Sequence, residues 1–358
     1  MDGLKVLGWS DWFAAAAVEG AVGAGTLARV TAELRGEYRL RTAGGEFPAQ
    51  LAPRLRKGAA DRLDRPMVGD WVVVEPVSGG AEVTIHDIMP RKTLLARRGA
   101  GGGGEVQPIA ANVDLVFIVM GLDGNYNPRR LERYLVAARE SGAEPVVILS
   151  KADLCPDTAE RVAEAEVLAH GARVVPVSSL AGEGVAVVRE VLAPGVTACF
   201  VGSSGVGKST LVNRLAGEEV MATGAVRERD AKGRHTTTHR QMILLPCGAI
   251  VIDTPGMREF GLWQAGEGLA ASFPEIAELA RRCRFHDCSH AHEPGCAVRD
   301  ALAVGEIDQG RYASYLKLRK EDDEAAARDD VVARQERKGK ERRIAKGLRV
   351  VLRKKGKK

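Results

Sequence analysis

The sequence predicts a multidomain α/β protein with three folded parts: a small N-terminal β-barrel, an α/β domain and a helical C-terminal domain. Three observations support this. Short apolar strands recur between residues 27 and 95, a phosphate-binding motif lies at 202–209, and three of the six cysteines are crowded between residues 283 and 296. A chain of 358 residues is long enough for two or three domains.

Composition narrows the class of protein. The apolar fraction of 45% is ordinary for a globular protein. The sequence has no uninterrupted apolar run of membrane-spanning length and no evident secretory signal. We therefore expect a cytoplasmic protein without a membrane partner.

Charge is distributed unevenly along the chain. Residues 331–358 contain thirteen Lys and Arg against two Glu, a net charge of +11, whereas the preceding 330 residues carry −6. Such a basic tail usually has a polyanionic partner, which in the cytosol is most often RNA. A solvated, disordered end gives the same pattern.

The first part of the chain consists of short strands. Four segments rich in Val, Ile and Tyr and separated by Gly and Pro predict strands at Leu27–Leu34, Glu37–Thr42, Trp71–Pro76 and Glu82–Ile88. The pattern fits a small barrel, of which the oligonucleotide-binding (OB) barrel is one common type, and it fits a generic β module equally well. The glycine-rich segment Gly99–Gly104 then predicts a flexible linker.

The middle of the chain alternates strands with helices. Two continuous apolar runs, Asp114–Met120 and Pro145–Leu149, flank the helical segment Pro128–Ser141 and therefore predict buried parallel strands. Further short strands are predicted at Val174–Val177, Thr197–Val201, Ile243–Leu245 and Ala249–Ile252. After Gly261 the pattern becomes helical and rich in Cys and His.

A P-loop follows the strand Thr197–Val201. Residues 202–209 fit G-x-x-x-x-G-K-[ST], and the predicted helix Ser209–Leu215 begins where the motif requires one. In such a loop backbone N–H groups wrap a β-phosphate, Lys208 reaches the β- and γ-phosphates, and Ser209 gives an oxygen to Mg²⁺. The expected binding residues are Gly202, Ser203, Ser204, Gly205, Val206, Gly207, Lys208, Ser209 and Thr210.

Asp253 ends an apolar strand and is followed by Thr-Pro-Gly. After a P-loop, this pattern predicts that Asp253 holds Mg²⁺ through water and that the N–H of Gly256 contacts the γ-phosphate. We therefore expect Lys208, Asp253 and Gly256 to take part in catalysis.

A base-reading motif lies upstream of the P-loop. It directly follows an apolar strand and consists of Ser150, Lys151, Ala152 and Asp153. The Asp153 carboxylate can accept hydrogen bonds from the N1–H and the exocyclic amine of guanine, a donor pair that adenine lacks. Ser178 and Ser179, after a further strand, can offer backbone N–H groups to the base.

The order of these motifs is unusual. In an ordinary GTPase the base-reading motif comes last, whereas here it precedes the P-loop. Residues 105–265 therefore have the motif order of a circularly permuted P-loop GTPase domain. Such a permutation is tolerable because domain termini usually lie at the surface and often close together.

A polar loop, Gly-Arg-His-Thr-Thr-Thr at 233–238, lies between the P-loop and Asp253. Thr237 can ligate Mg²⁺ when a γ-phosphate is present, and His235 is either a catalytic group or an ordinary loop residue. Met257 stands where ordinary GTPases carry the Gln that orients the attacking water, so we expect slow intrinsic hydrolysis that another group or a partner assists.

The cysteine cluster has the spacing of a metal site. Three thiolates and one imidazole form a donor set that suits tetrahedral, structural Zn²⁺, with no position left open for catalysis. The set is Cys283, Cys288, His290 and Cys296. His286 and His292 are alternative imidazole ligands, and the remaining alternative is a cluster of incidental thiols.

Together these motifs resemble the ribosome small-subunit-dependent GTPase A family, which consists of circularly permuted bacterial GTPases. The resemblance rests on the motif order, G-V-G-K-S-T, G-R-H-T-T-T, D-T-P-G and C-x4-C-x-H-x5-C. It also includes P-M-V-G-D at Pro66–Asp70, P-R-K from Pro90 and I-A-A-N-V-D at Ile109–Asp114. It runs from the barrel to the cysteine cluster and does not cover the basic tail.

The resemblance implies an architecture. We expect an OB-type barrel within residues 1–98, the permuted GTPase domain at 105–265, a helical zinc-binding domain at 266–330 and the basic tail at 331–358. One zinc ion per subunit is implied on Cys283, Cys288, His290 and Cys296. The family's base motif usually begins with an Asn that braces the P-loop and guanine. Ser150 departs from this pattern, which implies weaker nucleotide binding.

The resemblance also implies a role in late maturation of the small (30S) ribosomal subunit. GTP hydrolysis is then stimulated by the subunit and accompanied by release of a ribosome-binding assembly factor. The expected partners are the subunit with its rRNA and that factor, Mg²⁺ accompanies GTP, and the protein acts as a monomer. One alternative is a nucleotide-gated rRNA-binding module in which hydrolysis is only a slow timer. A P-loop kinase is the other, and the base motif argues against it.

Guanine selection by Asp153 can be tested directly. Asp153→Asn puts a donor where guanine needs an acceptor, so we expect weaker GTP binding and relaxed selection toward xanthine nucleotides, which present a carbonyl there. Competition between GTP and XTP measures both effects. A variant that binds GTP as tightly as the parent would show that the base is read elsewhere.

Overall fold

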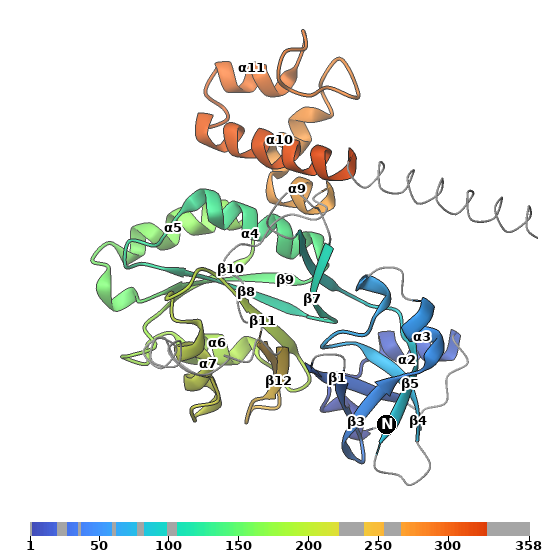
Figure 1. The fold of residues 1–358 in the computed structure, drawn as a ribbon. Coiled ribbons are helices and arrows are strands. Elements are labelled where there is room, and N and C mark those ends of the chain that lie inside the picture. The colour runs from blue at the N-terminus through green and yellow to red at the C-terminus, as the bar shows by residue number, and fades with distance from the viewer. Residues whose placement is uncertain are drawn as a thin grey trace, which may run out of the picture.

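The computed structural model describes residues 2–19, 27–34, 37–58, 62–76, 82–98, 106–221, 240–253 and 266–327. Within these ranges a β-barrel, an α/β domain and a group of C-terminal helices follow one another, which confirms the predicted fold class (Figure 1). The predicted linker, the polar loop at 233–238, the residues after Asp253 up to 265 and the basic tail lie outside the described residues.

Five strands close the N-terminal barrel. They are β1 (Leu27–Leu34), β2 (Glu37–Thr42), β3 (Gly45–Leu51), β4 (Trp71–Pro76) and β5 (Val83–Ile88). They pair in the order β1-β2-β3-β5-β4, and β4 returns to β1, as in an OB-type barrel. Between β3 and β4 lie the short helix α3 (Pro53–Gly58) and a 3₁₀ turn at Arg62–Asp64. Four of the five strands were predicted, and β3 was missed.

Two N-terminal helices cover one end of the barrel. They are α1 (Asp2–Lys5) and α2 (Asp11–Glu19). The ring of Trp9 meets the buried Trp71 of β4 edge to face, with centroids 4.8 Å apart, and Phe13 lies 5.9 Å from the same ring. Aromatic burial therefore fixes this end of the chain on the barrel.

Among the described residues, six strands belong to the α/β domain. They are β8 (Leu115–Gly121), β9 (Glu144–Ser150), β10 (Arg173–Val177), β11 (Thr197–Val201), β12 (Arg240–Leu244) and β13 (Ile250–Asp253). Their order is β10-β9-β8-β11-β13-β12; all neighbours pair in parallel except β12, which is antiparallel to β13. Strand β9, which carries the base motif, is thus separated from the P-loop strand β11 by β8 alone. The base motif and the P-loop are therefore close in the sheet even though β9 comes before β11 in the chain.

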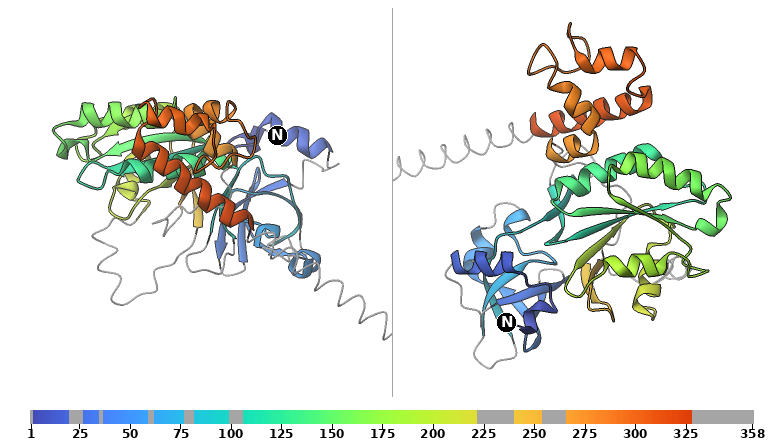
Figure 2. Two further views of the ribbon diagram at one scale, coloured as in Figure 1. Left: turned by 90° about the horizontal axis from the view of Figure 1, so that it is seen from above. Right: turned by 180° about the vertical axis from the view of Figure 1, so that it is seen from behind.

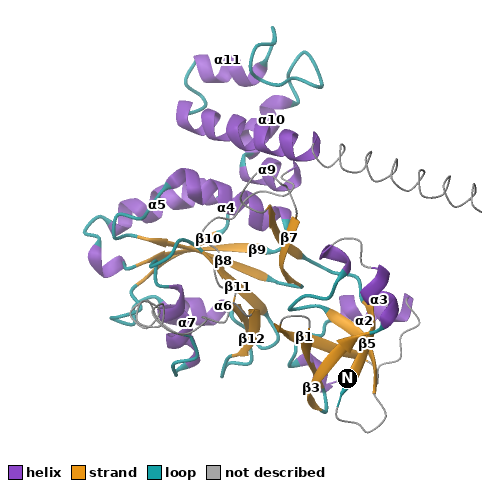
Figure 3. Cartoon of the chain, in the orientation of Figure 1, coloured by secondary structure: helices purple, strands orange, loops and turns teal. Residues whose placement is uncertain are grey.

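Helices cover both faces of this sheet (Figure 3). The helices α4 (Pro128–Glu140) and α5 (Thr158–Ala169) lie on one face, and α6 (Val185–Val191) and α7 (Lys208–Ala216) lie on the other. Residues of β8 alternate between the two apolar cores: Ile118 packs with α4 and α5, whereas Phe117 packs with α6 and α7. Burial on both faces explains why the sequence of β8 is continuously apolar.

The sheet does not stop at the α/β domain. Strand β12 pairs with β1 of the barrel in antiparallel register, Ala32 with Gln241 and Glu33 with Arg240, so one eleven-stranded sheet runs through both. A two-stranded ribbon, β6 (Leu94–Arg98) and β7 (Val106–Ala111), forms the covalent connection between barrel and α/β domain.

A buried guanidinium joins the segments that meet at this junction. Arg29 of β1 is 1% exposed. It donates hydrogen bonds to the carbonyl oxygens of Gly69 at 3.2 Å and Asn112 at 3.0 Å, and also to that of Leu7. Three segments, before the barrel, inside it and after it, are therefore tied to one side chain.

Asn112 completes the junction. Its backbone is left-handed, with φ of 55°. Its side-chain amide donates to the Gly69 carbonyl at 3.0 Å and its side-chain oxygen accepts from the N–H of Lys92 at 2.8 Å. Burial lowers the pKa of Arg29 to about 10, so the guanidinium stays charged at neutral pH.

The C-terminal helices lie beyond α4 (Figures 1 and 2). They are α9 (Gly266–Ser272), α10 (Pro274–Ala280), α11 (Ala297–Ala303) and a longer helix at residues 309–327. Helix α9 packs closely on α4. A Cβ at residue 268 would lie 2.3 Å from the carbonyl oxygen of Val136, so the two helices can approach this closely because the residue is glycine. The N–H of Gly268 donates to the Glu140 carboxylate at 2.8 Å.

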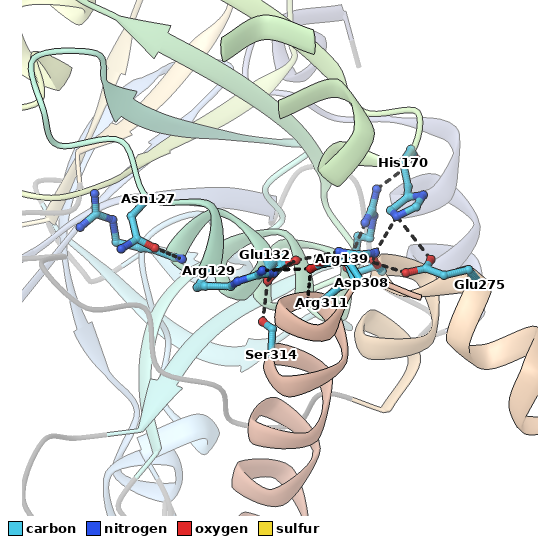
Figure 4. A network of polar contacts seen from close by, with 11 residues as sticks. Asn127, Arg129, Glu132, Arg139, His170, Glu275, Asp308, Arg311 and Ser314 are labelled. Atoms are coloured by element: carbon cyan, nitrogen blue, oxygen red, sulfur yellow. Dashed lines mark hydrogen bonds and ion pairs between the residues drawn. The ribbon is translucent and has the colours of Figure 1, made fainter. Parts of the chain in front are cut away.

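A network of polar contacts around the buried Arg311 and Glu132 connects these helices to the α/β domain (Figure 4). Arg311 donates to Glu132 of α4 at 2.9 Å, to Glu275 of α10 at 2.7 Å and to the carbonyl of Ser272 at 2.6 Å. It also meets Nε2 of His170, after α5, at 2.6 Å. Burial, and secondly the Arg311 charge, lower the pKa of His170, which favours the neutral ring that can accept this bond.

Glu132 is the acceptor at the centre of the network. It is 1% exposed and accepts hydrogen bonds from Arg129, Arg311 and the hydroxyl of Ser314. A buried carboxylate needs such a full set of donors, because an unpaired charge in this place is strongly destabilising. Helix 309–327 is therefore positioned on α4 by specific polar contacts.

Arg29 should be essential for barrel stability. Arg29→Met leaves the carbonyls of Leu7 and Asn112 without this donor and that of Gly69 with the Asn112 amide alone, and each unpaired buried acceptor costs about 1–3 kcal/mol. We expect a clearly lower urea midpoint in tryptophan fluorescence, which reports on the buried Trp71. Arg54→Met, at an exposed ion pair with Asp87 on the same barrel, is the matched control and should change stability by at most about 1 kcal/mol. Equal midpoints for both variants would contradict the assigned role.

Candidate nucleotide site and metal centre

The candidate nucleotide residues gather at one edge of the sheet. The carboxyl ends of β8, β9, β10, β11 and β13 meet there because these strands are parallel. Ser150 at the end of β9 is in register with Gly121 of β8 and with Val177 of β10. The base motif, the P-loop and Asp253 each follow or end one of these strands. Such an edge is where open α/β sheets bind ligands.

The P-loop connects the buried strand β11 to α7. Three glycines have positive φ: Gly202 at 147°, Gly205 at 78° and Gly207 at 95°. At Gly202 a side chain is excluded as well, because a Cβ would lie 2.4 Å from the Val119 carbonyl oxygen. The Lys208 ammonium donates to the carbonyls of Gly202 and Ser203, both at 2.7 Å. It therefore lies over the loop.

Ser150 contacts the P-loop directly. Its side chain is buried, and its hydroxyl donates to the carbonyl oxygen of Val206 at 2.6 Å. The hydroxyl oxygen also lies 3.2 Å from the Met120 carbonyl. A brace between the base motif and the P-loop is therefore present although Ser replaces the Asn usual in the family.

The rest of the base motif leads out to solvent. Lys151 has a left-handed backbone, and Ala152–Leu154 forms the 3₁₀ turn η3, in which Asp153 is exposed. Ser178 differs from expectation, because its N–H donates to the Glu183 carbonyl at 3.0 Å within its own turn.

Three further expected residues lie close to this edge. The carbonyl of Ser179 accepts a bond from Arg214 of α7 at 2.8 Å. Ser209 and Thr210 lie, half-buried, in the first turn of α7. This places the hydroxyl of Ser209 at the start of the helix that follows the P-loop.

Asp123 was not identified from the sequence. It lies two residues after β8, and its carboxylate forms an ion pair with Lys151. The hydrogen bond from Lys151 is the main reason why the pKa of Asp123 is lowered. The available signal was its position, an acidic residue directly after a buried parallel strand.

Asp253 is the last residue of β13 and is paired with Gln241 of β12. It therefore ends the strand next to the P-loop strand β11, and its role toward Mg²⁺ stays a prediction. The predictions for His235, Thr237, Gly256 and Met257 fall outside the described residues.

The cysteine cluster forms a compact set of ligand atoms. Cys283, Cys288, His290 and Cys296 place one ligand atom each within 4.8 Å of all the others. Nδ1 of His290 lies 3.6 Å from Sγ of Cys283 and 3.5 Å from Sγ of Cys296, and these two sulfurs are 3.9 Å apart. In a tetrahedron with zinc–ligand bonds of ordinary length, a nitrogen and a sulfur ligand lie about 3.6 Å apart and two sulfur ligands about 3.8 Å apart. The residues therefore fit zinc.

The surroundings of the cluster support this fit. The hydroxyl of Tyr312 donates to the carbonyl of His290 at 2.7 Å, and Arg319 donates to the carbonyl of Cys288 at 2.9 Å. Burial lowers the pKa of His290, which favours the neutral imidazole that a metal requires. The alternative ligands His286 and His292 are both exposed.

Comparison with known proteins identifies the family. The model of the RsgA GTPase family matches residues 88–263. A curated small ribosomal subunit biogenesis GTPase RsgA from Opitutus terrae is 48% identical over 344 residues, which cover 93% of this chain and 94% of the relative. The chain belongs to the RsgA GTPase family. A relative of the same name from Streptomyces coelicolor is 44% identical and covers 97% of this chain and 93% of its own length.

Solved structures agree with the RsgA assignment. YjeQ from Thermotoga maritima superimposes with a TM-score of 0.63 at 27% identity, covering 83% of this chain and 98% of its own. YloQ, described as a circularly permuted GTPase, gives a TM-score of 0.59 at 23% identity, covering 84% and 95%, and supports the fold. As an RsgA family member the chain is a GTPase with a permuted domain. None of the helices in the described ranges is long and apolar enough to cross a membrane.

Metal removal should act locally. Apparent binding free energies of structural zinc sites are about 10–16 kcal/mol, which exceeds the stability of most domains. We expect Cys288→Ser to unfold the C-terminal helices while GTP binding is largely retained, as measured by hydrogen exchange and nucleotide titration. Cys247→Ser, at a half-buried thiol outside the cluster, is the control. Purified parent protein without zinc in elemental analysis would refute the assignment.

Proposed function

We propose that this protein hydrolyses GTP to assist late maturation of the small ribosomal subunit, in the cytoplasm and as a monomer. The observation that carries the proposal is near full-length similarity to curated RsgA proteins, which are named for small ribosomal subunit biogenesis. The proposed domain limits are 1–98, 105–265, 266–330 and the tail 331–358. The barrel, the zinc domain and the tail are the proposed contacts to rRNA.

The residues have distinct proposed roles in GTP binding. The P-loop, Gly202 to Thr210, wraps the phosphates, and Lys208 neutralises charge on the β- and γ-phosphates. Asp153 reads guanine, while Ser150 braces the base loop against the P-loop. Ser178 and Ser179 shape the neighbouring turn.

Mg²⁺ accompanies GTP in this scheme. Oxygen ligands suit this hard cation. The Ser209 hydroxyl supplies one, Asp253 holds the ion through water at the same sheet edge, and Thr237 is added in the GTP state. The ion would neutralise charge on the phosphates. Gly256 offers its N–H to the γ-phosphate, and His235 is the proposed candidate for positioning water.

Hydrolysis by the isolated protein is expected to be slow. Met257 cannot orient a water molecule as the Gln of ordinary GTPases does, so the subunit must complete the catalytic arrangement. We further propose that the GTPase cycle releases a ribosome-binding assembly factor from the subunit. The second candidate function is a nucleotide-gated rRNA-binding module in which GTP hydrolysis serves only as a slow timer. Met257 favours this candidate, and GTP turnover stimulated by the subunit would exclude it.

Turnover with and without the subunit separates these functions. Purified small subunits should raise the GTP hydrolysis rate by about tenfold or more, because a partner that completes a GTPase site has effects of this size or larger. Large subunits are the matched control particle, and Lys208→Ala should abolish both rates. If the GTP hydrolysis rate is the same with and without small subunits, only the rRNA-binding module with slow hydrolysis remains as a candidate function.

A further inference from the structure

Asp123 lies beside two loops of the candidate nucleotide site. Strand β8 lies between β9 and β11 in the sheet, so the residues after β8 are flanked by the base motif and by the P-loop. The N–H of Leu122 donates to the carbonyl of Ser150 at 2.9 Å. This bond fixes the start of the Asp123 loop against the base motif.

The loop is built to hold the carboxylate in one place. A Cβ on Gly121 would lie 2.5 Å from Oδ1 of Asp123, so glycine at this position leaves room for the carboxylate where it lies. The backbone N–H groups of Asp123 and Asn125 help to lower the pKa of this carboxylate. Arg130 of α4 donates to the Asn125 side chain at 2.6 Å. The position of the carboxylate is therefore fixed by the loop backbone and by α4.

The partner of this carboxylate is the Lys151 ammonium. The two side chains are 29% and 31% exposed, so the ion pair is partly shielded from water. The backbone of Lys151 has φ of 59° and ψ of 39°, a conformation that is uncommon for residues other than glycine. Lys151 is therefore fixed at both ends: by its backbone after β9 and by Asp123 at its tip.

We propose that Asp123 is a positioning residue of the nucleotide site, which holds the Lys151 ammonium so that Lys151 presents its aliphatic stem to the purine base. A free ammonium on a flexible stem would be attracted to the nucleotide phosphates. A paired one is already in place before binding, which removes an entropic cost. The inference rests on the proposed GTP-binding function and adds a residue to its specificity site.

Asp123→Asn tests this role, because it removes the charge and keeps the shape. We expect the Kd for GDP in titration calorimetry to rise about fivefold, the effect of a partly exposed ion pair, and to depend more steeply on salt. The KM for GTP should rise with little change in kcat, because the ion-pair partner of Asp123 is Lys151 of the base motif and not a residue of the P-loop. Asp123→Glu should restore part of the affinity.

A double-mutant cycle shows whether Asp123 acts through Lys151. In a Lys151→Met background, Asp123→Asn should have no further effect on the Kd, because residues in contact are not additive. Glu164→Gln breaks a comparable exposed pair with Arg161 on α5, 2.9 Å long, and should leave the Kd unchanged. Thermal melting of each variant checks folding.

Two outcomes would overturn the inference alone. The first is that Asp123→Asn binds GDP as tightly as the parent. The second is that Asp123→Asn weakens GDP binding equally in the parent and in the Lys151→Met background, while the parent binds GDP and Asp153→Asn does not bind it. If the parent itself fails to bind GDP, the proposed function is refuted together with this inference. If Asp123→Asn does not fold, Asp123→Glu, which keeps the charge, is compared with Lys151→Met. Asp123→Glu binding GDP no more tightly than Lys151→Met would also refute the inference.

Discussion

The guanidinium of Arg29 holds together the segments on which the arrangement of barrel and α/β domain depends. It is buried, and its hydrogen bonds to the carbonyls of Leu7, Gly69 and Asn112 come from three parts of the chain. Five donors in a rigid plane allow one side chain to satisfy several carbonyls at fixed angles. The turn at Pro66–Asp70 and the segment Ile109–Asp114 are therefore coupled in space through one residue of β1.

The other end of the α/β domain is attached by different chemistry. There, side chains meet side chains: Arg311 contacts Glu132 and Glu275, and Ser314 contacts Glu132. Buried ion pairs add little net stability compared with apolar packing, but breaking one partner is costly. Such contacts select one orientation of the C-terminal helices over others. The candidate nucleotide edge thus lies in a domain whose two neighbours are each held in a defined position.

The sequence identified the elements whose signal is local. Continuous apolar runs marked β8, β9 and β11, and glycine spacing marked the P-loop. Strand β3 was missed because Gly45 and Pro48 interrupt its pattern, and its pairing with β2 and β5 overrides that weak propensity. Asp123 and Arg29 were missed for another reason: their partners, Lys151 and the carbonyls around Gly69, are close only in the folded chain. The zinc cluster was visible because its ligands are near one another in sequence.

The continuity of the sheet between β1 and β12 has a consequence for how the chain is made. Glu33 pairs with Arg240, which the ribosome adds about 200 residues later, and contacts of such long separation form slowly. During synthesis the part of β1 around Ala32 and Glu33, which β4 does not cover, is therefore an open strand edge after the rest of the barrel can already close, and such edges favour pairing with other chains. Completion of the α/β domain covers it. The β12 pairing thus ends an exposure that lasts while β6 to β11 are synthesised.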